Sequence, residues 1–82
     1  MINVSVLGYG TVGSGVVEII RENAELIKKR TGEEIRVKSV LDLRDFFGDS
    51  VQEILVHDFE QIVTDEEVQI VVETMGGLHP AY

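Results

Sequence analysis

The chain has 82 residues, a length that suits one small domain and excludes two. Its 15 acidic and 7 basic residues give a formal charge of −8. An acidic surface repels phosphate backbones and anionic lipids, so the composition argues against binding to nucleic acid or to a membrane surface. The absence of cysteine excludes disulfides, thiolate catalysis and cysteine metal sites. Residues 1–7 have neither a basic head nor a long apolar stretch, so they predict no signal peptide or membrane span, and a cytoplasmic protein.

The first half of the chain predicts a strand, a glycine-rich turn and a helix. Residues Asn3–Leu7 form a short, apolar and β-branched segment that stops at glycine, which is typical of a buried strand. After the glycine-rich start, apolar residues recur at helical spacing from Val12 to about Arg30, with charged residues on the other side. Basic residues at 28–30 and Gly32 predict the end of this helix. Its expected apolar side consists of Val12, Val16, Ile19, Ile20, Ala24 and Ile27.

The second half predicts three further strands and a short helix. The strands are expected at Ile35–Leu41, Ile54–Val56 and Gln69–Glu73. In the first of them, polar positions 36 and 38 alternate with Ile35, Val37 and Ser39. Mixed charge and a glycine predict a loop over residues 42–52, with the phenylalanines at 46 and 47 anchoring it on the core. A short helix is expected from Asp58 to about Val63, capped by His57 or Asp58, and another helix is expected to begin near Pro80.

The order of these elements predicts the fold class. Strands that alternate with helices form a parallel sheet with right-handed crossovers, which is an α/β fold. The expected strand order is 3-2-1-4, the first half only of a Rossmann-like, doubly wound sheet. Residues 1–82 would then form one nucleotide-binding unit.

The segment Gly8-Tyr9-Gly10-Thr11-Val12-Gly13 fits the pattern G-x-G-x-x-G. The pattern alone is weak, but here it directly follows a predicted strand and opens a predicted helix, as the dinucleotide-binding fingerprint requires. The first glycine would allow the tight turn, the second would let a pyrophosphate approach the backbone, and the third would let the helix pack closely on the strand. N–H groups in the first turn of the helix, at Thr11 and Val12, would then bind the pyrophosphate. The alternative is a turn that only joins strand to helix, and a Walker-type loop is excluded because no Gly-Lys-Ser/Thr follows.

Two charged residues follow the second predicted strand, where the fingerprint places the group that binds the adenosine ribose. Asp42 would accept hydrogen bonds from the ribose hydroxyls and favour NAD. Arg44 would pair with a 2′-phosphate and favour NADP. The alternative for both is an ordinary solvated loop charge.

Two segments resemble homoserine dehydrogenase. One is Gly8–Val17, read as GYGTVGSGVV, and the other is Val71–Gly77, read as VVETMGG, with Pro80 and Ala81 behind it. The first is shared loosely with many Rossmann enzymes, whereas the second, at this distance from the first, is far more specific. The resemblance covers the whole chain.

The resemblance implies an NAD(P)-dependent enzyme that interconverts homoserine and aspartate 4-semialdehyde, in threonine and methionine biosynthesis. It implies that the glycine loop binds the pyrophosphate and that Arg44 has the place of the family's basic residue for the 2′-phosphate, which gives a slight preference for NADP. It places Thr74, Met75 and Gly76 on the nicotinamide side. It also implies that the catalytic lysines, the substrate domain and the dimerising segments lie beyond residue 82, so the chain alone is expected to be a truncated, inactive NAD(P)-binding domain.

Other interpretations stay open at this point. The chain is alternatively a stand-alone nucleotide-binding module without catalysis, or the cofactor domain of another dehydrogenase with a small substrate. In the truncated sheet the strand Gln69–Glu73 would leave an open edge, so self-association through that edge is expected. The two histidines, His57 and His79, lack partners at ligand spacing, so no metal site is expected. Glu73 is expected to be hydrogen-bonded at a strand end, with a role near the nicotinamide as the alternative, and residues 65–67 predict a solvated turn.

Overall fold

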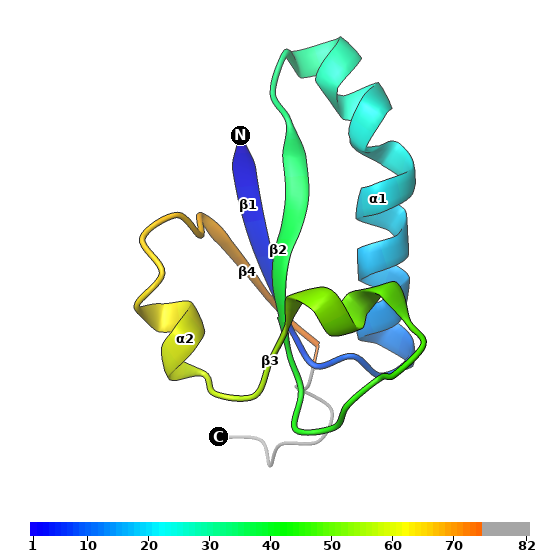
Figure 1. Cartoon of the computed structure of the whole chain (residues 1–82). Helices are drawn as coiled ribbons and strands as arrows, with labels where there is room; N and C mark the ends of the chain where they lie inside the picture. The colour runs from blue at the N-terminus through cyan, green and yellow to red at the C-terminus, as the bar shows by residue number, and fades with distance from the viewer. Residues whose placement is uncertain (75–82) are drawn as a thin grey trace.

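The computed structural model describes residues 1–74, which are built around a four-stranded parallel sheet (Figure 1). The strands are β1 (Ile2–Leu7), β2 (Ile35–Leu41), β3 (Leu55–Val56) and β4 (Ile70–Glu73). Their order in the sheet is β3-β2-β1-β4, which confirms the predicted order 3-2-1-4. The carboxyl ends of all four strands therefore lie at the same edge of the sheet, where α/β proteins bind ligands.

Helical segments cover both faces of the sheet. Helix α1 (Thr11–Thr31) lies on one face and the short helix α2 (Glu60–Val63) on the other (Figure 1). A 3-10 helix, η1 (Ser50–Ile54), precedes β3. Helix α1 ends as predicted, because Gly32 adopts a φ of 77° and its N–H bonds the Lys28 carbonyl at 2.8 Å.

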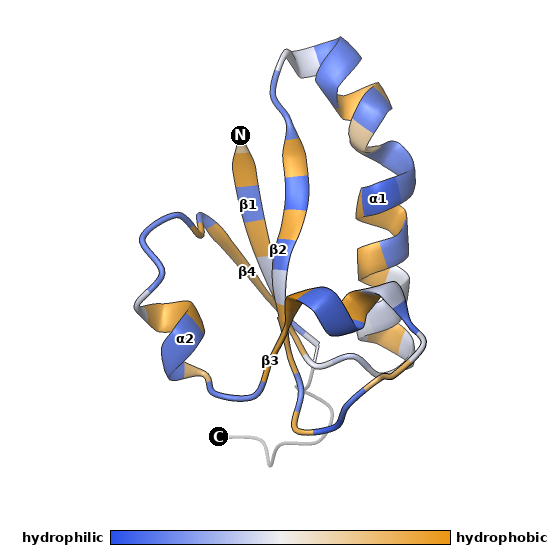
Figure 2. Ribbon diagram, in the orientation of Figure 1, coloured by the Kyte–Doolittle hydropathy of each residue, from blue (hydrophilic) through white to orange (hydrophobic). Residues whose placement is uncertain are grey.

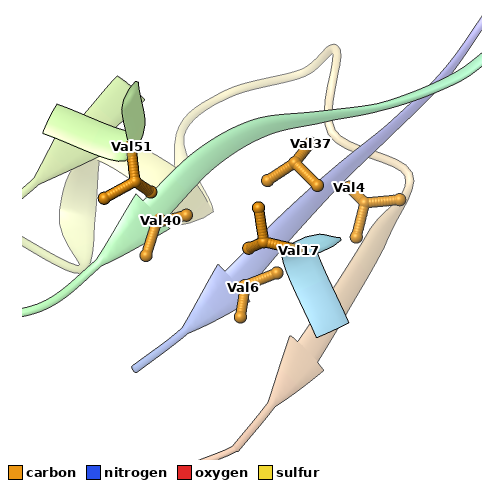
Figure 3. Close-up of a cluster of buried hydrophobic side chains, with 6 residues drawn as sticks. All are labelled: Val4, Val6, Val17, Val37, Val40 and Val51. Atoms are coloured by element: carbon orange, nitrogen blue, oxygen red, sulfur yellow. The ribbon is translucent and has the colours of Figure 1, made fainter. Parts of the chain in front are cut away.

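The apolar core lies between the sheet and α1. It is a cluster of six buried valines that come from β1, β2, α1 and η1 (Figure 3), namely Val4, Val6, Val17, Val37, Val40 and Val51. Apolar and polar residues alternate along β1 and β2, as Figure 2 shows, because successive side chains of a strand point to opposite faces. The valine cluster packs α1 against the two central strands.

The apolar side of α1 agrees with the predicted one only in part, because Val16 and Ile20 pack against the core as expected. Val12 and Ile19 were expected to pack, yet they are 65% and 61% exposed, whereas Val17 is 2% exposed. Gly13, one turn before Val17, is the other buried residue of the helix. The two buried residues of the helix have different surroundings, since Val17 belongs to the valine cluster and Gly13 lies directly against the carbonyl group of Gly8. A pattern of large apolar residues does not reveal a contact made by a glycine.

The pairing of β1 with β2 contains an irregularity that the alternation of side chains does not predict. Val4 pairs with Val37, but the next residue of β1, Ser5, pairs with Ser39, so Lys38 is the extra residue of a β-bulge. The bulge corrects the expected alternation beyond position 37. Val40 lies in the core, and Ser39 lies on the opposite face, where its hydroxyl is 2.6 Å from that of Ser5.

The predicted loop over residues 42–52 contains the beginning of η1. Asp49 starts it by accepting a hydrogen bond from the N–H of Val51 at 2.9 Å, and Val51 is fully buried. Of the two phenylalanines predicted to anchor this loop, Phe46 packs against the core and Phe47 is 82% exposed, so the second half of that prediction is wrong. At the start of α2, the Asp58 side chain accepts a hydrogen bond from the Glu60 N–H at 2.9 Å.

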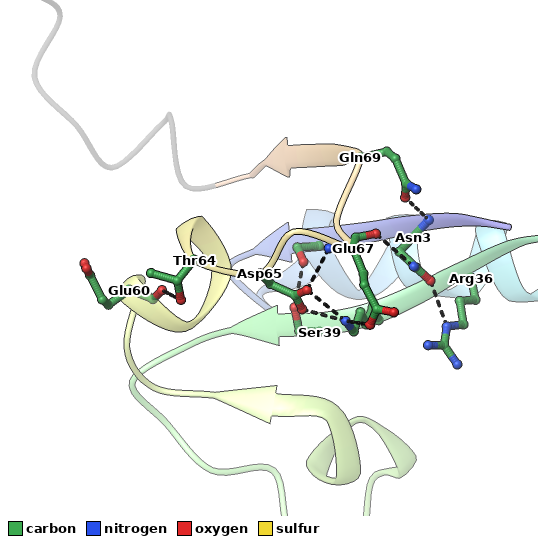
Figure 4. Close-up of polar contacts among 10 residues, drawn as sticks. Asn3, Arg36, Ser39, Glu60, Thr64, Asp65, Glu67 and Gln69 are labelled. Atoms are coloured by element: carbon green, nitrogen blue, oxygen red, sulfur yellow. Dashed lines mark hydrogen bonds and ion pairs between the residues drawn. The ribbon is translucent and has the colours of Figure 1, made fainter.

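On the face of the sheet that α2 covers, polar contacts hold the segment before β4 (Figure 4), and Ile62 is the buried residue of α2. The Asn3 side chain donates to the Glu67 carbonyl at 2.9 Å, and its backbone N–H donates to the Gln69 side chain at 2.7 Å. Lys38, at the bulge, pairs with Asp65 at 2.7 Å and with Glu67 at 2.8 Å. These contacts tie the segment before β4 to the two central strands.

Several predictions fall outside residues 1–74. They are the site roles of Met75 and Gly76, the helix expected near Pro80, and the surroundings of His79. Within the described part of the chain, no helix is both long and apolar enough to cross a membrane.

Candidate functional site at the carboxyl ends of the strands

The glycine turn joins β1 to α1 at very close range. Gly8 has a φ of 99°, a conformation that side-chain-bearing residues rarely adopt, and this confirms its predicted role in the tight turn. A Cβ added to Gly13 would lie 1.9 Å from the Gly8 carbonyl oxygen, which confirms the predicted close packing of helix on strand. A Cβ at Gly10 would meet nothing within 4 Å. Two of the three glycines are therefore required by the turn itself, and the third leaves open space in front of the helix.

Thr74 fastens the end of β4 to this turn. Its hydroxyl donates to the Leu7 carbonyl at 2.8 Å and contacts the Gly8 carbonyl at 3.0 Å, and its N–H also bonds the Leu7 carbonyl at 3.1 Å. The same hydroxyl oxygen would lie 3.0 Å from a Cβ on Gly13. The structure thus gives Thr74 a supporting role behind the glycine turn, in addition to a place at the edge of the groove described below.

Asp42, at the end of β2, holds the glycine turn from the other side. One carboxylate oxygen accepts the Tyr9 N–H at 3.0 Å, and the side chain is 10% exposed. Arg44 pairs with both oxygens through Nε at 3.0 Å and Nη2 at 2.9 Å. Hydrogen bonds from the Arg44 side chain, then from the backbone N–H groups of Arg44 and Tyr9, hold the pKa of Asp42 well below its usual range, although desolvation opposes this shift.

Aromatic rings support the same corner of the molecule. The Arg44 guanidinium carbon lies 5.2 Å from the centre of the Phe46 ring, and Phe46 meets Tyr9 edge-to-face at 4.9 Å. The Tyr9 hydroxyl donates to Asp49 at 3.0 Å, and partial burial together with this bond raises the pKa of Tyr9. Arg44 therefore lies on a supported surface rather than on a free loop.

These residues line an open groove of about 590 Å³ at the carboxyl edge of the sheet. All four strands contribute to it, through residues that end or directly follow them: Gly8, Tyr9, Gly10, Leu41, Asp42, Leu43, Arg44, His57, Phe59 and Thr74. Six predicted site residues are thus brought together. Leu41, Leu43, His57 and Phe59 were not predicted, although their positions at or just after strand ends would have identified them.

The other predicted site residues within residues 1–74 lie in the first turn of α1. Thr11 and Val12 form the first exposed turn of the helix, and Gly13 is buried. No acidic residue lies in that first turn and no side chain caps it, so within the described structure its positive dipole end is not neutralised by the chain itself. His57, at the groove, contacts Asp45 at 3.0 Å. Across residues 1–74, no group of three or more metal-ligating side chains is placed to hold an ion.

The chain is similar to known proteins that share one name. No family model matches the chain. Homoserine dehydrogenase from Helicobacter pylori is 40% identical over 83 residues, which are 99% of this chain and 19% of that protein. The enzyme from Synechocystis is 41% identical over 83 residues, 98% of this chain and 19% of the relative.

Solved structures agree with this relationship. A crystal structure of homoserine dehydrogenase from S. aureus at pH 6.5 matches with a TM-score of 0.82 and 36% identity, and covers 96% of this chain and 21% of the solved chain. The chain spans about a fifth of the length of the curated relatives it matches. Over that span, the chain is similar in sequence to the homoserine dehydrogenases and has the Rossmann-like α/β fold of their solved structures.

Proposed function

We propose that residues 1–82 form the NAD(P)-binding domain of a homoserine dehydrogenase. The observation that carries this proposal is the groove at the carboxyl edge of the sheet, where the uncapped start of α1 and the open space at Gly10 meet the Asp42–Arg44 pair. In a dinucleotide, the pyrophosphate would bind at the start of α1 beside Gly10, and the adenosine ribose would lie at the Asp42–Arg44 pair. We also propose that the whole protein interconverts homoserine and aspartate 4-semialdehyde, in threonine and methionine biosynthesis and in the cytoplasm; the name of the relatives supports this proposal.

In this proposal the glycine loop supplies backbone contacts rather than charged side chains. The pyrophosphate would lie over Gly10 and accept hydrogen bonds from the N–H groups of Thr11 and Val12. The absence of a Cβ at Gly10 leaves room for it, because a Cβ there would point into otherwise open space. The nicotinamide side would lie toward Thr74, with Met75 and Gly76 following it in the sequence.

The cofactor would be NADP or NAD, with a slight preference for NADP. Arg44 is 64% exposed in its side chain, lies at the groove and is the group with a positive charge for a 2′-phosphate. The nicotinamide dinucleotide, once bound, supplies the hydride chemistry, and the residues of this chain bind and orient it. The substrate and the proton-transfer groups would belong to parts of the relatives outside the matched fifth.

The proposal is tested by calorimetric titration of the purified chain with NADP(H) and with NAD(H). We expect weak binding of a nicotinamide dinucleotide and no homoserine-dependent reduction of it. The variant Gly10→Val should lose this binding, and Gly15→Ala is its control, since a Cβ at position 15 meets nothing within 4 Å and Gly15 does not line the groove. A chain that binds neither dinucleotide would contradict the proposed function, and turnover of homoserine would contradict the assignment of the catalytic groups to other parts of the relatives.

A second proposal concerns the outer edge of β4, which could pair with another copy of the chain. Strand β4 pairs only with β1 in the described residues, and its Ile70 and Val71 are 43% and 48% exposed. Exposed apolar residues on a strand whose outer edge has no partner among the described residues favour association. We therefore propose that the chain self-associates along β4.

A further inference from the structure

We infer that Asp42 is a positioning residue that holds Arg44 and the glycine loop, and that it is not the group that binds the ribose of the dinucleotide. The inference rests on the proposed function and adds how this chain would choose between the two cofactors. In the common form of the fingerprint, the acidic residue at the end of the second strand takes the ribose hydroxyls. The hydrogen bonds of this chain instead indicate that Asp42 holds Arg44 and that Arg44 faces the ligand.

The carboxylate of Asp42 is already fully used. A carboxylate has about four lone-pair sites for hydrogen bonds. One oxygen accepts the backbone N–H of Arg44 and its Nε, both at 3.0 Å. The other accepts Nη2 of Arg44 at 2.9 Å and the backbone N–H of Tyr9 at 3.0 Å. A ribose hydroxyl therefore finds an acceptor on Asp42 only if one of these donors leaves.

Arg44, by contrast, keeps an edge for an anion. Its Nε and Nη2 face Asp42, and because the guanidinium group is planar, the edge formed by Nη1 and the outer hydrogen of Nη2 points elsewhere. The side chain is 64% exposed, and the Phe46 ring 5.2 Å away supports the guanidinium group. A phosphate monoester can take that outer edge in the two-bond geometry that arginine offers, while the pair with Asp42 stays intact.

The two cofactors would therefore make different demands on the same pair. A 2′-phosphate extends the existing row of alternating charges, from Asp42 through Arg44 to the phosphate, and keeps Arg44 between the two negative groups. A free 2′-hydroxyl needs Asp42 as its acceptor, so it must first displace Arg44 from Asp42. The bond between the Arg44 guanidinium group and the Asp42 carboxylate joins two charged groups, and it is stronger than the hydrogen bond that a hydroxyl forms with the same carboxylate. The ion pair thus masks Asp42 against NAD and prepares Arg44 for NADP.

Removal of Arg44 should expose the masked acceptor, and this gives a sharp test. NADP and NAD are each titrated into four proteins: the full chain, the variant Arg44→Ala, the double variant Arg44→Ala/Asp42→Asn, and the control Arg30→Ala. Arg30 is a matched loss of one positive charge, in the last turn of α1 at the far end from the glycine turn. We expect Arg44→Ala to weaken NADP about tenfold or more and to tighten NAD by about threefold to tenfold, since a hydrogen bond to a charged group is gained.

The double variant separates Asp42 from general effects of charge. We expect Arg44→Ala/Asp42→Asn to lose the gain in NAD affinity, and Arg30→Ala to change neither affinity. Arg44 is exposed, so the single variant keeps the fold, which thermal melting verifies. An Arg44→Ala chain that binds NAD no more tightly than the wild type, or a gain that survives the loss of Asp42, would overturn the inference while leaving the proposed function intact. A wild-type chain that binds neither dinucleotide would overturn both.

Discussion

The close approach of α1 to the glycine turn makes opposite predictions for two glycines in the same helix. Gly13 and Gly15 both lie near the start of α1. A Cβ on Gly13 would lie 1.9 Å from the Gly8 carbonyl oxygen and 2.8 Å from the carbon of that group. A Cβ on Gly15 would have nothing within 4 Å. The same substitution, glycine to alanine, should therefore destabilise the protein at the first position and stabilise it at the second.

The magnitudes follow from two opposing effects. Inserting a methyl group into a packed interior costs about 1–3 kcal/mol, and the cost at Gly13 should be near the upper end because the neighbour is backbone that cannot rotate away. Alanine recovers about 1 kcal/mol of helix propensity at either position. Gly13→Ala should therefore lower the free energy of unfolding by about 2 kcal/mol, and Gly15→Ala should raise it by about 1 kcal/mol.

Equilibrium unfolding in urea measures the difference between these variants. With a denaturant dependence of about 1.5 kcal/mol per M, a gap of about 3 kcal/mol places the two midpoints about 2 M apart. The Gly15→Ala variant is the control, because it carries the same change in helix propensity without the contact. Equal midpoints for the two variants would show that α1 does not approach the turn as closely as described, and the account of the glycine motif would then be wrong.

Three further predictions concern the groove, the polar face and the sheet edge. Gly10→Val should abolish dinucleotide binding and leave the melting temperature nearly unchanged, because its side chain enters open space in the groove, and calorimetry that finds unchanged affinity would exclude a cofactor on this loop. Lys38→Ala should destabilise the fold more at about pH 7 than at about pH 2. The hydrogen bond from Lys38 lowers the pKa of Asp65 in the folded state. The stability that this pair contributes is therefore present above the ordinary pKa of 3.8 and is lost as the pH falls through the lowered pKa. Lys29→Ala, which removes an exposed lysine at the end of α1, is its control, and equal losses at both pH values would argue against the pair. Light scattering at increasing concentration should show self-association that Val71→Lys on β4 reduces and Val63→Lys on α2 does not, whereas a strictly monomeric wild type would contradict pairing along β4.

The strand order and the glycine turn could be predicted because local pattern and fold agree there. The apolar, β-branched pattern of residues 2–7 and 35–41 predicts strands without further information. The glycine spacing predicts both the turn and the helix that follows it. Gly8 and Gly13 have the conformation and the contact that the motif requires. In these places a residue's role depends on its near neighbours in the sequence.

The parts that could not be predicted depend on contacts between distant segments. The bulge at Lys38 moves Val40 into the core and Ser39 out of it, and nothing in the sequence of β2 alone states that an extra residue is present. Whether Asp42 faces a ligand or is held by Arg44 and Tyr9 likewise depends on where the glycine turn lies against the end of β2. The groove residue Phe59 follows a two-residue strand that has little pattern of its own.

The central position of β1 has a consequence for how the chain is made. Synthesis runs from the N-terminus to the C-terminus, so β1 leaves the ribosome before both strands that pair with it. One of its edges waits for β2 and the other for β4, the last described element. A newly made strand of uninterrupted valine and isoleucine would stick to other nascent chains during that interval. In β1, Asn3 and Ser5 alternate with Val4 and Val6, and both polar side chains later find partners on the face that α2 covers. We expect these two polar residues to make the newly made strand less prone to aggregate, and in the finished sheet they bond neighbouring segments.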